Sequence, residues 1–150
     1  MKIALACDHG GLALKKAIAQ YLKENGYETA DFGTTTENSC DYPDFALLAA
    51  EAVAGGKCDR GIFVCTTGIG ISIAANKVPG IRCALCTDAT CARLTREHNN
   101  ANVLALGGGI VGVNLALDIV KTFLETEFSE LEKHQRRIDK ITAIEQKYLK

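Results

Sequence analysis

The stretch "GIFVCTTGIGISIAANK", residues 61–77, decides the fold of this 150-residue chain. An apolar run from Ile62 to Val64 leads into Cys65, two threonines and a turn in which two glycines flank one isoleucine. This order predicts a buried strand, a tight turn and the start of a helix. Because the N–H groups at a helix N-terminus attract negative charge, the turn predicts an anion site with Cys65 at its mouth.

Two nucleotide-binding motifs begin in a similar way but do not fit this stretch. A dinucleotide fingerprint needs a third glycine three residues after the second, whereas Gly70 is followed by Ile71, Ser72 and Ile73. A P-loop needs a Gly-Lys-Ser or Gly-Lys-Thr step, which is absent. The stretch therefore predicts a site for a small anionic molecule.

Outward from this stretch, short apolar or β-rich runs alternate with longer runs that have helical spacing. The runs that predict strands cover residues 3–7, 28–32, 61–65, 81–86 and 103–106. The runs that predict helices cover residues 12–26, 43–56, 68–76, 89–98, 113–123 and 129–148. Such alternation predicts one α/β domain over residues 1–150, a three-layer α/β/α, Rossmann-like fold with a five-stranded parallel sheet and an extra C-terminal helix. We expect its strands to be buried on both faces.

The last predicted helix, about residues 129–148, has no strand after it and so no place in the alternation. Apolar residues recur along it at helical spacing, among many charged residues: Leu131, Ile138, Ile141, Ile144 and Tyr148. This stripe covers either the end of its own domain or a partner subunit. We favour the partner subunit.

Composition favours small molecules as partners. The net charge is −1 with acids and bases interspersed, which is not the footprint of a protein that binds nucleic acid or an anionic membrane. No apolar run is long enough to span a bilayer. Met1 and Lys2 lead straight into "IALAC" without the pattern of an export signal, so we expect a cytoplasmic protein.

The chain has seven cysteines, an odd number that we expect to be mostly reduced thiols. Only Cys83 and Cys86 have a spacing typical of metal ligands. Residues three apart on a strand point to opposite faces, and no second pair of ligands follows. We therefore interpret these two cysteines as small core residues and expect no metal site.

In parallel α/β sheets the ligand binds beyond the carboxyl ends of the strands. The polar and glycine-rich stretches of this chain fall at those ends: Asp8–Gly11, Cys65–Gly70, Asp88 and Gly107–Gly109. We expect one cleft to collect all of them.

Cys65 is the candidate reactive group. A thiol beside a helix N-terminus ionises more readily, and the thiolate acts as a nucleophile or as a base. Nucleophilic chemistry needs a nearby histidine, and we expect His98 to come within reach. The anion site also suits a base that generates an oxyanion, as in an enediolate. The alternative is that Cys65 only ends a buried strand.

Three other groups have both a functional and a structural interpretation. Asp8 and His9 are able to share proton transfer and phosphate binding, or they form an ordinary solvated pair. His98 alone is a suitable cation for a helix C-terminus. The basic residues of "KHQRR", residues 133–137, either form a solvated helix face or capture a dianionic phosphate.

Several stretches occur in order over nearly the whole chain: "CDHGG", "DYPDFA", "GIGISIAANKVPGIRCAL", "REHNNANVLALGG" and "HQRRIDKITAIEQ". Together they resemble the RpiB/LacAB sugar-phosphate isomerase family, to which ribose-5-phosphate isomerase B belongs. The resemblance implies an isomerase without metal or cofactor that interconverts ribose 5-phosphate and ribulose 5-phosphate in the pentose phosphate pathway. It also implies a homodimer or a dimer of dimers with each active site at the subunit interface.

The resemblance further implies that Cys65 is the base that moves a proton between C1 and C2, and that His98 is the acid that opens the sugar ring. Another branch of the family uses a glutamate at about the position of Ile71. Asp8 and Thr67 are then expected beside the reacting carbons. The other implied contacts of substrate or phosphate are His9, Thr66, Gly68, Ile69, Gly70, Asn99, Lys133 and Arg137.

Several positions depart from the pattern of the family, and three of them concern the substrate site. Thr66 stands where glycine is usual, and Gly109 and Lys133 stand where arginine is common. Lysine lacks the bidentate fork with which arginine holds phosphate. The departures motivate an alternative substrate, a tetrose 4-phosphate or a hexose 6-phosphate such as allose or galactose 6-phosphate. A further alternative is a non-catalytic subunit, since some members of the family work only as hetero-oligomers.

Overall fold

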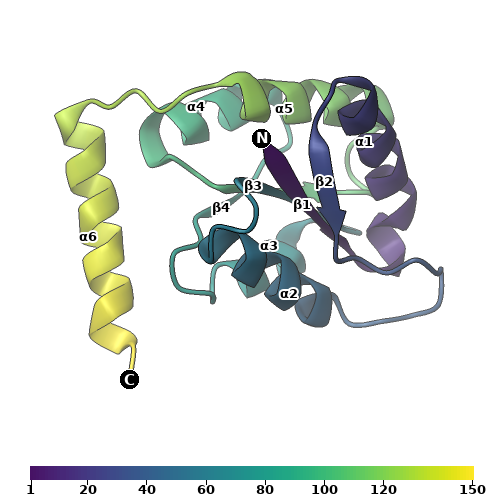
Figure 1. Cartoon of the computed structure of the whole chain (residues 1–150), viewed down its shortest axis with the longest axis horizontal. Helices are drawn as coiled ribbons and strands as arrows, with labels where there is room; N and C mark the ends of the chain where they lie inside the picture. The colour runs from purple at the N-terminus through teal and green to yellow at the C-terminus, as the bar shows by residue number, and fades with distance from the viewer.

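Five parallel strands form one sheet in the computed structural model, which describes all residues from 1 to 150. The strands are β1 (Lys2–Cys7), β2 (Glu28–Asp31), β3 (Arg60–Cys65), β4 (Cys83–Leu85) and β5 (Val103–Gly107). Their spatial order is β2-β1-β3-β5-β4, and every neighbouring pair is parallel (Figure 1). The predicted sheet is confirmed, and all its carboxyl ends lie at one edge.

The helices agree closely with the predicted ranges. They are α1 (Leu12–Glu24), α2 (Tyr42–Ala54), α3 (Ile69–Ala75), α4 (Ala89–Asn99), α5 (Val113–Glu125) and α6 (Glu132–Tyr148), with a 3-10 turn, η1 (His9–Gly11), before α1. None of them combines the length and hydropathy needed to cross a membrane.

The sheet separates two apolar clusters, which confirms the three layers. Alternate residues of a strand point to opposite faces. Leu5 and Leu104 accordingly pack with residues of α1 and α5, whereas Phe63 and Ala105 pack with residues of α2 and α3. Figure 1 shows these helices on opposite sides of the sheet. Cys65 belongs to the second cluster, so its side chain lies on the α2–α3 face.

The two edge strands are less buried than the sequence predicted. Three of the four residues of β2 are exposed, because an edge strand has a neighbour on one side only. β4 begins at Cys83 rather than at residue 81. The Arg82 N–H donates to the Asn102 side-chain oxygen at 2.9 Å instead of to a neighbouring strand. The prediction of burial on both faces is correct for the three central strands and wrong for these two.

α6 lies outside the three layers (Figure 1). Only His134 and Ile138 of this helix are buried. Ile141, Ile144 and Tyr148 of the predicted apolar stripe are between 48% and 73% exposed. The helix therefore leaves most of this stripe uncovered within a single chain.

Candidate functional site

Cys65 ends β3 directly before the turn into α3. The residue is 4% exposed, and its sulfur accepts a hydrogen bond from the Gly68 N–H at 3.1 Å. Gly68 has a φ of +76°, and a Cβ there would lie 2.8 Å from the Leu106 carbonyl carbon, so only glycine fits. The turn therefore holds a backbone donor against the sulfur.

Asp8 lies beside Cys65, because Cys7 and Val64 are partners across β1 and β3. It is 5% exposed, and its Oδ1 accepts a hydrogen bond from the Gly11 N–H at 3.1 Å. A carboxylate accepts more than one hydrogen bond. Asp8 therefore has capacity left for a hydroxyl group of a bound molecule.

Two adjoining cavities open at this edge of the sheet and share Asp8 and Tyr42. The Cys65 cavity, of about 440 Å³, is lined by Asp8, Tyr42, Cys65, Thr66, Thr67, Ile69, Gly70 and Ile73. The second, of about 480 Å³, is lined by Asp8, His9, Cys40, Asp41, Tyr42, Pro43 and Asp44. The structure thus brings together the predicted site residues that follow β1 and β3.

Tyr42 lines both cavities, but the sequence did not single it out. Its ring covers Gly70, where an added Cβ would overlap the ring. The available signal was an aromatic residue directly before Pro43 in "DYPDFA". A phenol ring at this place narrows the space between the two cavities.

His9 is exposed at the start of η1, and its ring is held by the loop between β2 and α2. The Cys40 N–H donates to the His9 Nδ1 at 3.2 Å. Because Nδ1 accepts this bond, the proton of a neutral His9 ring is on Nε2. The ring is thereby oriented, and its Nε2–H group is the donor that a bound molecule can use.

The Thr66 side chain occupies the space between two glycines. A Cβ on Gly10 would overlap the Thr66 hydroxyl, and a Cβ on Gly109 would lie 3.1 Å from the Thr66 methyl carbon. The N–H groups of Gly108 and Gly109 donate to the carbonyl oxygens of Cys65 and Thr66, each at 2.8 Å. Gly108 and Gly109 therefore fix the backbone at Cys65 and Thr66. Their lack of side chains leaves room for the Thr66 side chain.

His98 does not reach Cys65 within one chain, so that prediction is wrong for the single subunit. α4 starts after the carboxyl end of β4 and runs back along the sheet, which places His98 at the amino edge beside the entry to β5. The single predicted cleft is also wrong. Asp88 caps α4 by accepting from the Cys91 N–H at 2.7 Å, and it lines neither cavity.

At that far end, His98 stacks on His134 of α6, with ring centroids 4.3 Å apart and an angle of 15° between the rings. We call the group His98, Asn99, Lys133, His134 and Arg137 the His98 cluster. It contains every predicted site residue that is missing from the two cavities except Gly68, whose N–H donates to the Cys65 sulfur. His134 is the one member that sequence reasoning treated only as part of a basic run.

Burial lowers the pKa of His134, and the nearby charges of His98, Lys133 and Arg137 lower it further against an opposing effect of Glu97. An imidazole with a depressed native pKa binds its proton more readily in the unfolded chain. Protonation of His134 therefore favours unfolding.

We expect the melting temperature to fall as the pH drops below about 6.5, the usual pKa of an unfolded histidine, and to fall less in His134→Gln. Thermal melts of the wild type and the variant at about pH 7.5 and about pH 5.5 test this expectation. Equal losses in the two proteins would assign the acid sensitivity to other groups.

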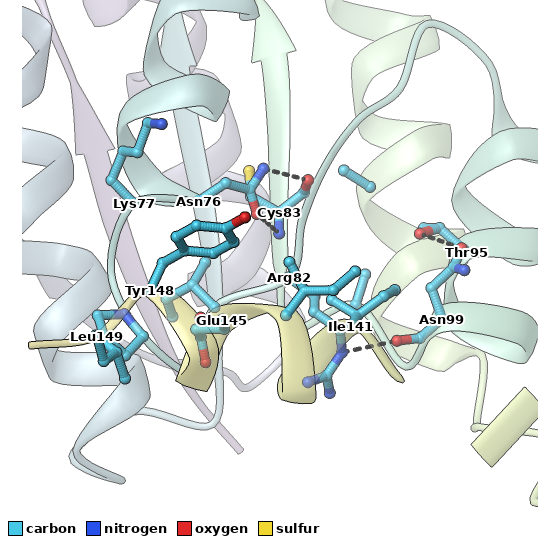
Figure 2. Close-up of a pocket in the computed structure, with 15 residues that line it drawn as sticks. Asn76, Lys77, Arg82, Cys83, Thr95, Asn99, Ile141, Glu145, Tyr148 and Leu149 are labelled. Atoms are coloured by element: carbon cyan, nitrogen blue, oxygen red, sulfur yellow. Dashed lines mark hydrogen bonds between the residues drawn. The ribbon is translucent and has the colours of Figure 1, made fainter. Parts of the chain in front are cut away.

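The largest cavity, of about 670 Å³, lies between α6 and the β4 edge (Figure 2). Eight of its fifteen lining residues are apolar. Its polar groups bond to one another: Asn76 pairs with the backbone of Cys83 at 2.8 and 2.9 Å, and Arg82 Nε donates to the Asn99 carbonyl at 2.8 Å. This groove has the character of a packing surface, whereas the Cys65 cavity presents groups suited to chemistry.

The other strand-end cysteines are structural. Burial raises the pKa of Cys7 to about 11 and that of Cys86 to about 12, and it also raises the pKa of Cys83. All seven cysteines are free thiols. No group of three or more His, Cys, Asp or Glu side chains has the arrangement of a metal site.

Residues 3–141 match the model of the Ribose/Galactose Isomerase family. Ribose-5-phosphate isomerase B of Escherichia coli is 49% identical over 97% of each chain. The galactose-6-phosphate isomerase subunit LacB of Clostridium acetobutylicum is 43% identical over 96% of this chain and 83% of its own. Among solved structures, Clostridium thermocellum ribose-5-phosphate isomerase B superposes with a TM-score of 0.98, at 59% identity over 99% of this chain and all of the other.

The similarity extends over almost the whole chain in sequence and in three-dimensional structure. It includes both the strand–turn–helix stretch around Cys65 and the first part of α6. The protein therefore belongs to the Ribose/Galactose Isomerase (RpiB/LacAB) family of sugar-phosphate isomerases.

Proposed function

We propose that this chain is an aldose–ketose isomerase that interconverts D-ribose 5-phosphate and D-ribulose 5-phosphate, a step of the pentose phosphate pathway, in the cytoplasm. One observation carries the proposal. The Cys65 sulfur accepts a hydrogen bond from the Gly68 N–H at 3.1 Å, in a cavity that Asp8 and Thr67 also line. The names of the Escherichia coli and Clostridium thermocellum relatives support the choice of substrate.

In the proposed reaction the open-chain aldose lies with C1 and C2 against Cys65. The thiolate takes the C2 proton, which leaves an enediolate, and the thiol then returns a proton to C1 while the hydroxyl proton moves from O2 to O1. Asp8 and Thr67 hold the hydroxyl groups beside these carbons. Backbone N–H groups of the turn Thr66–Gly70 stabilise the oxyanion, the kind of term that dominates many enzyme rates.

His98 is the proposed acid that opens the sugar ring, and we propose that it comes from a second copy of the chain. Within one chain it lies at the opposite edge of the sheet from Cys65. Ile69 and Ile73 of α3 line the Cys65 cavity and are exposed, and Leu47 is exposed on the adjacent helix α2. A partner that covers them is able to bring its own His98 to the cavity.

The stripe on α6 is the second proposed contact between subunits. Ile141, Ile144 and Tyr148 are exposed and face the largest groove, which lies open at the β4 edge of the sheet (Figure 2). Burial of this apolar area against a second copy favours association. A homodimer, alone or as half of a dimer of dimers, then contains two complete sites.

The phosphate is proposed to lie at the end of the site remote from Cys65. His9 reaches it from the same subunit, while Asn99, Lys133 and Arg137 reach it from the partner. Arg137 supplies the planar fork that suits a phosphate, and Lys133 contributes a point charge. Thr66, Gly68, Ile69 and Gly70 form the remaining wall of the site.

A second candidate substrate is a phosphorylated sugar of another length, such as galactose 6-phosphate. Thr66 motivates it, because it lines the Cys65 cavity at a position where glycine is usual in the family. The LacB relative motivates a third possibility, that the chain acts as one subunit of a hetero-oligomer. Asp8, Cys65 and Thr67 in one cavity favour catalysis over a purely structural subunit.

Proton NMR of ribose 5-phosphate with the purified protein in D2O and EDTA tests the proposal. We expect ribulose 5-phosphate to form with deuterium incorporated from solvent. Faster turnover of a tetrose or hexose phosphate in the same assay would transfer the proposal to that sugar. Absence of turnover of every sugar phosphate by the isolated chain would contradict catalysis by a homo-oligomer.

A further inference from the structure

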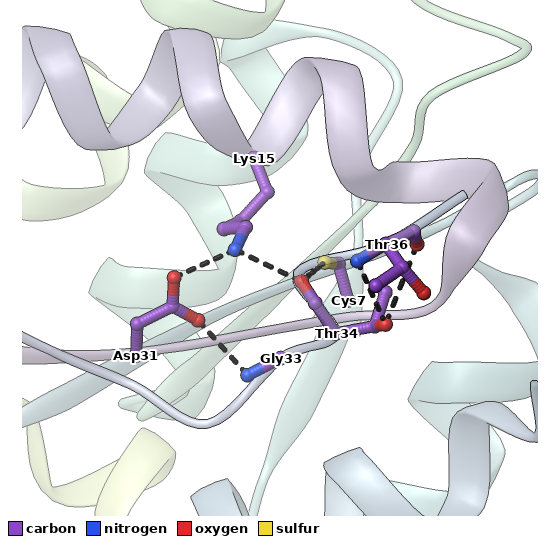
Figure 3. Close-up of polar contacts among 6 residues, drawn as sticks. All are labelled: Cys7, Lys15, Asp31, Gly33, Thr34 and Thr36. Carbon is purple, nitrogen blue, oxygen red and sulfur yellow. Dashed lines mark hydrogen bonds and ion pairs between the residues drawn. The ribbon is translucent and has the colours of Figure 1, made fainter. Parts of the chain in front are cut away.

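Lys15 of α1 is a buried cation that the proposed chemistry does not use. The residue is 4% exposed and lies next to Leu14 on a face of α1 that packs against the sheet. A buried ammonium group needs partners to offset the loss of water. Lys15 Nζ lies 2.6 Å from Asp31 Oδ2 and donates to the Thr34 carbonyl oxygen at 3.3 Å (Figure 3).

The two partners of Lys15 lie where β2 passes into the loop that joins it to α2, residues 32–41. Asp31 ends β2, and its second oxygen accepts from the Gly33 N–H at 2.9 Å. The Thr34 N–H donates to the Cys7 carbonyl at 3.1 Å. Figure 3 shows Lys15 reaching from α1 to this point, where the chain leaves the sheet. The ammonium group thus fixes the base of the loop in two places.

The other end of the same loop forms a wall of the proposed substrate site. The Cys40 N–H holds the His9 ring through Nδ1 at 3.2 Å, and Tyr42 separates the two cavities. Between the two ends, residues 35–39 are exposed. Loop 32–41 therefore connects the contacts of Lys15 at one end with the contact between Cys40 and His9 at the other.

Stability alone is a weak explanation for this ion pair. Pairing a buried lysine with a carboxylate that is 40% exposed gains little over an apolar side chain of similar size. Methionine in place of Lys15 would fill the same space beside Leu14 and Ile18 on α1. Methionine has no N–H donor, so it cannot link Asp31 to the Thr34 carbonyl oxygen as the Lys15 ammonium group does.

We propose that Lys15 is a positioning residue for substrate binding: through Asp31 and Thr34 it fixes the base of loop 32–41, so that Cys40 orients His9 and Tyr42 bounds the site. This inference rests on the proposed function, in which His9 contacts the phosphate of the sugar. Lys15 itself does not line either cavity and touches no substrate.

The test compares Lys15→Met with Lys16→Met, an exposed neighbour on the same helix. In Lys15→Met we expect the KM for ribose 5-phosphate to rise about tenfold with a smaller change in kcat, because misplaced binding groups weaken substrate capture. We also expect faster cleavage after the exposed Glu37 by a glutamate-specific protease. Lys16→Met should match the wild type in both measurements.

A double-mutant cycle with His9→Ala separates positioning from a general loss of stability. If Lys15 acts through His9, Lys15→Met has little further effect on KM in the His9→Ala background. An undiminished effect there, or unchanged KM and cleavage in Lys15→Met, would overturn the proposal. Asp31→Asn weakens the same Lys15–Asp31 contact by changing a partly exposed side chain. It replaces Lys15→Met as the test variant if Lys15→Met does not fold.

One measurement does not depend on the activity. The chain has three histidines, so His9→Asn assigns the His9 signals in a two-dimensional NMR spectrum of the imidazoles. Lys15→Met should shift or broaden the His9 signals and leave those of His98 and His134 in place. If wild type turns over no sugar phosphate, the proposed function fails, while this result and the protease result still decide the role of Lys15.

Discussion

Cys65→Ala is expected to lose about a thousandfold or more of kcat/KM on ribose 5-phosphate, the range by which a general base contributes to proton transfer. The change removes only the sulfur that meets the Gly68 N–H and leaves the turn and its glycines intact. Deuterium exchange at C2, followed by proton NMR in D2O, measures the proton transfer directly. A coupled assay for ribulose 5-phosphate measures the whole reaction.

Cys91→Ala is the matched control, since Cys91 is an exposed thiol on α4 that lines neither cavity. It should keep the rate of the wild type. Circular dichroism and the melting temperature of Cys65→Ala show whether the fold is retained. A folded Cys65→Ala variant with the activity of the wild type would mean that another group removes the proton.

Two inactive variants are expected to restore each other when their subunits are mixed. In the two-fold symmetric dimer that we propose, each site combines Cys65 of one subunit with His98 of the other. Cys65→Ala mixed with His98→Asn in equal amounts should regain about a quarter of the activity of the wild type, because half of the dimers are mixed and each has one intact site. Activity is measured before and after subunit exchange.

Cys65→Ala mixed with Cys65→Ser provides the control, because no combination of these subunits contains an intact site. Native mass spectrometry confirms that mixed dimers have formed. If they form and activity stays absent, His98 does not complete the site of its partner. If His98→Asn alone retains full activity, ring opening does not depend on His98.

Local patterns predicted the fold because they report burial directly. Alternating short apolar runs and helical spacings placed the central strands to within one or two residues, since β1, β3 and β5 are buried on both faces. The edge strands β2 and β4 were predicted with the wrong burial. Whether a strand lies at an edge depends on strand order, which local patterns do not contain.

The same distinction applies to the site. The reactive turn was predicted because its parts are neighbours in the chain: Cys65, Gly68 and the start of α3. Asp8 joined it because all carboxyl ends of a parallel sheet lie at one edge. Tyr42 and the contact between His9 and Cys40 were missed, since they connect residues far apart in sequence through a loop without regular structure.

The sequence by itself determined the α/β alternation, the central strands and the glycine turn after Cys65, because each depends on patterns among residues close together in the chain. Only the tertiary structure decided where His98 and Lys15 lie. α4 runs opposite to the strands, which separates His98 from Cys65 within one subunit. Lys15 meets Asp31 because α1 packs across β2, and the chain between them gives no local sign of the contact.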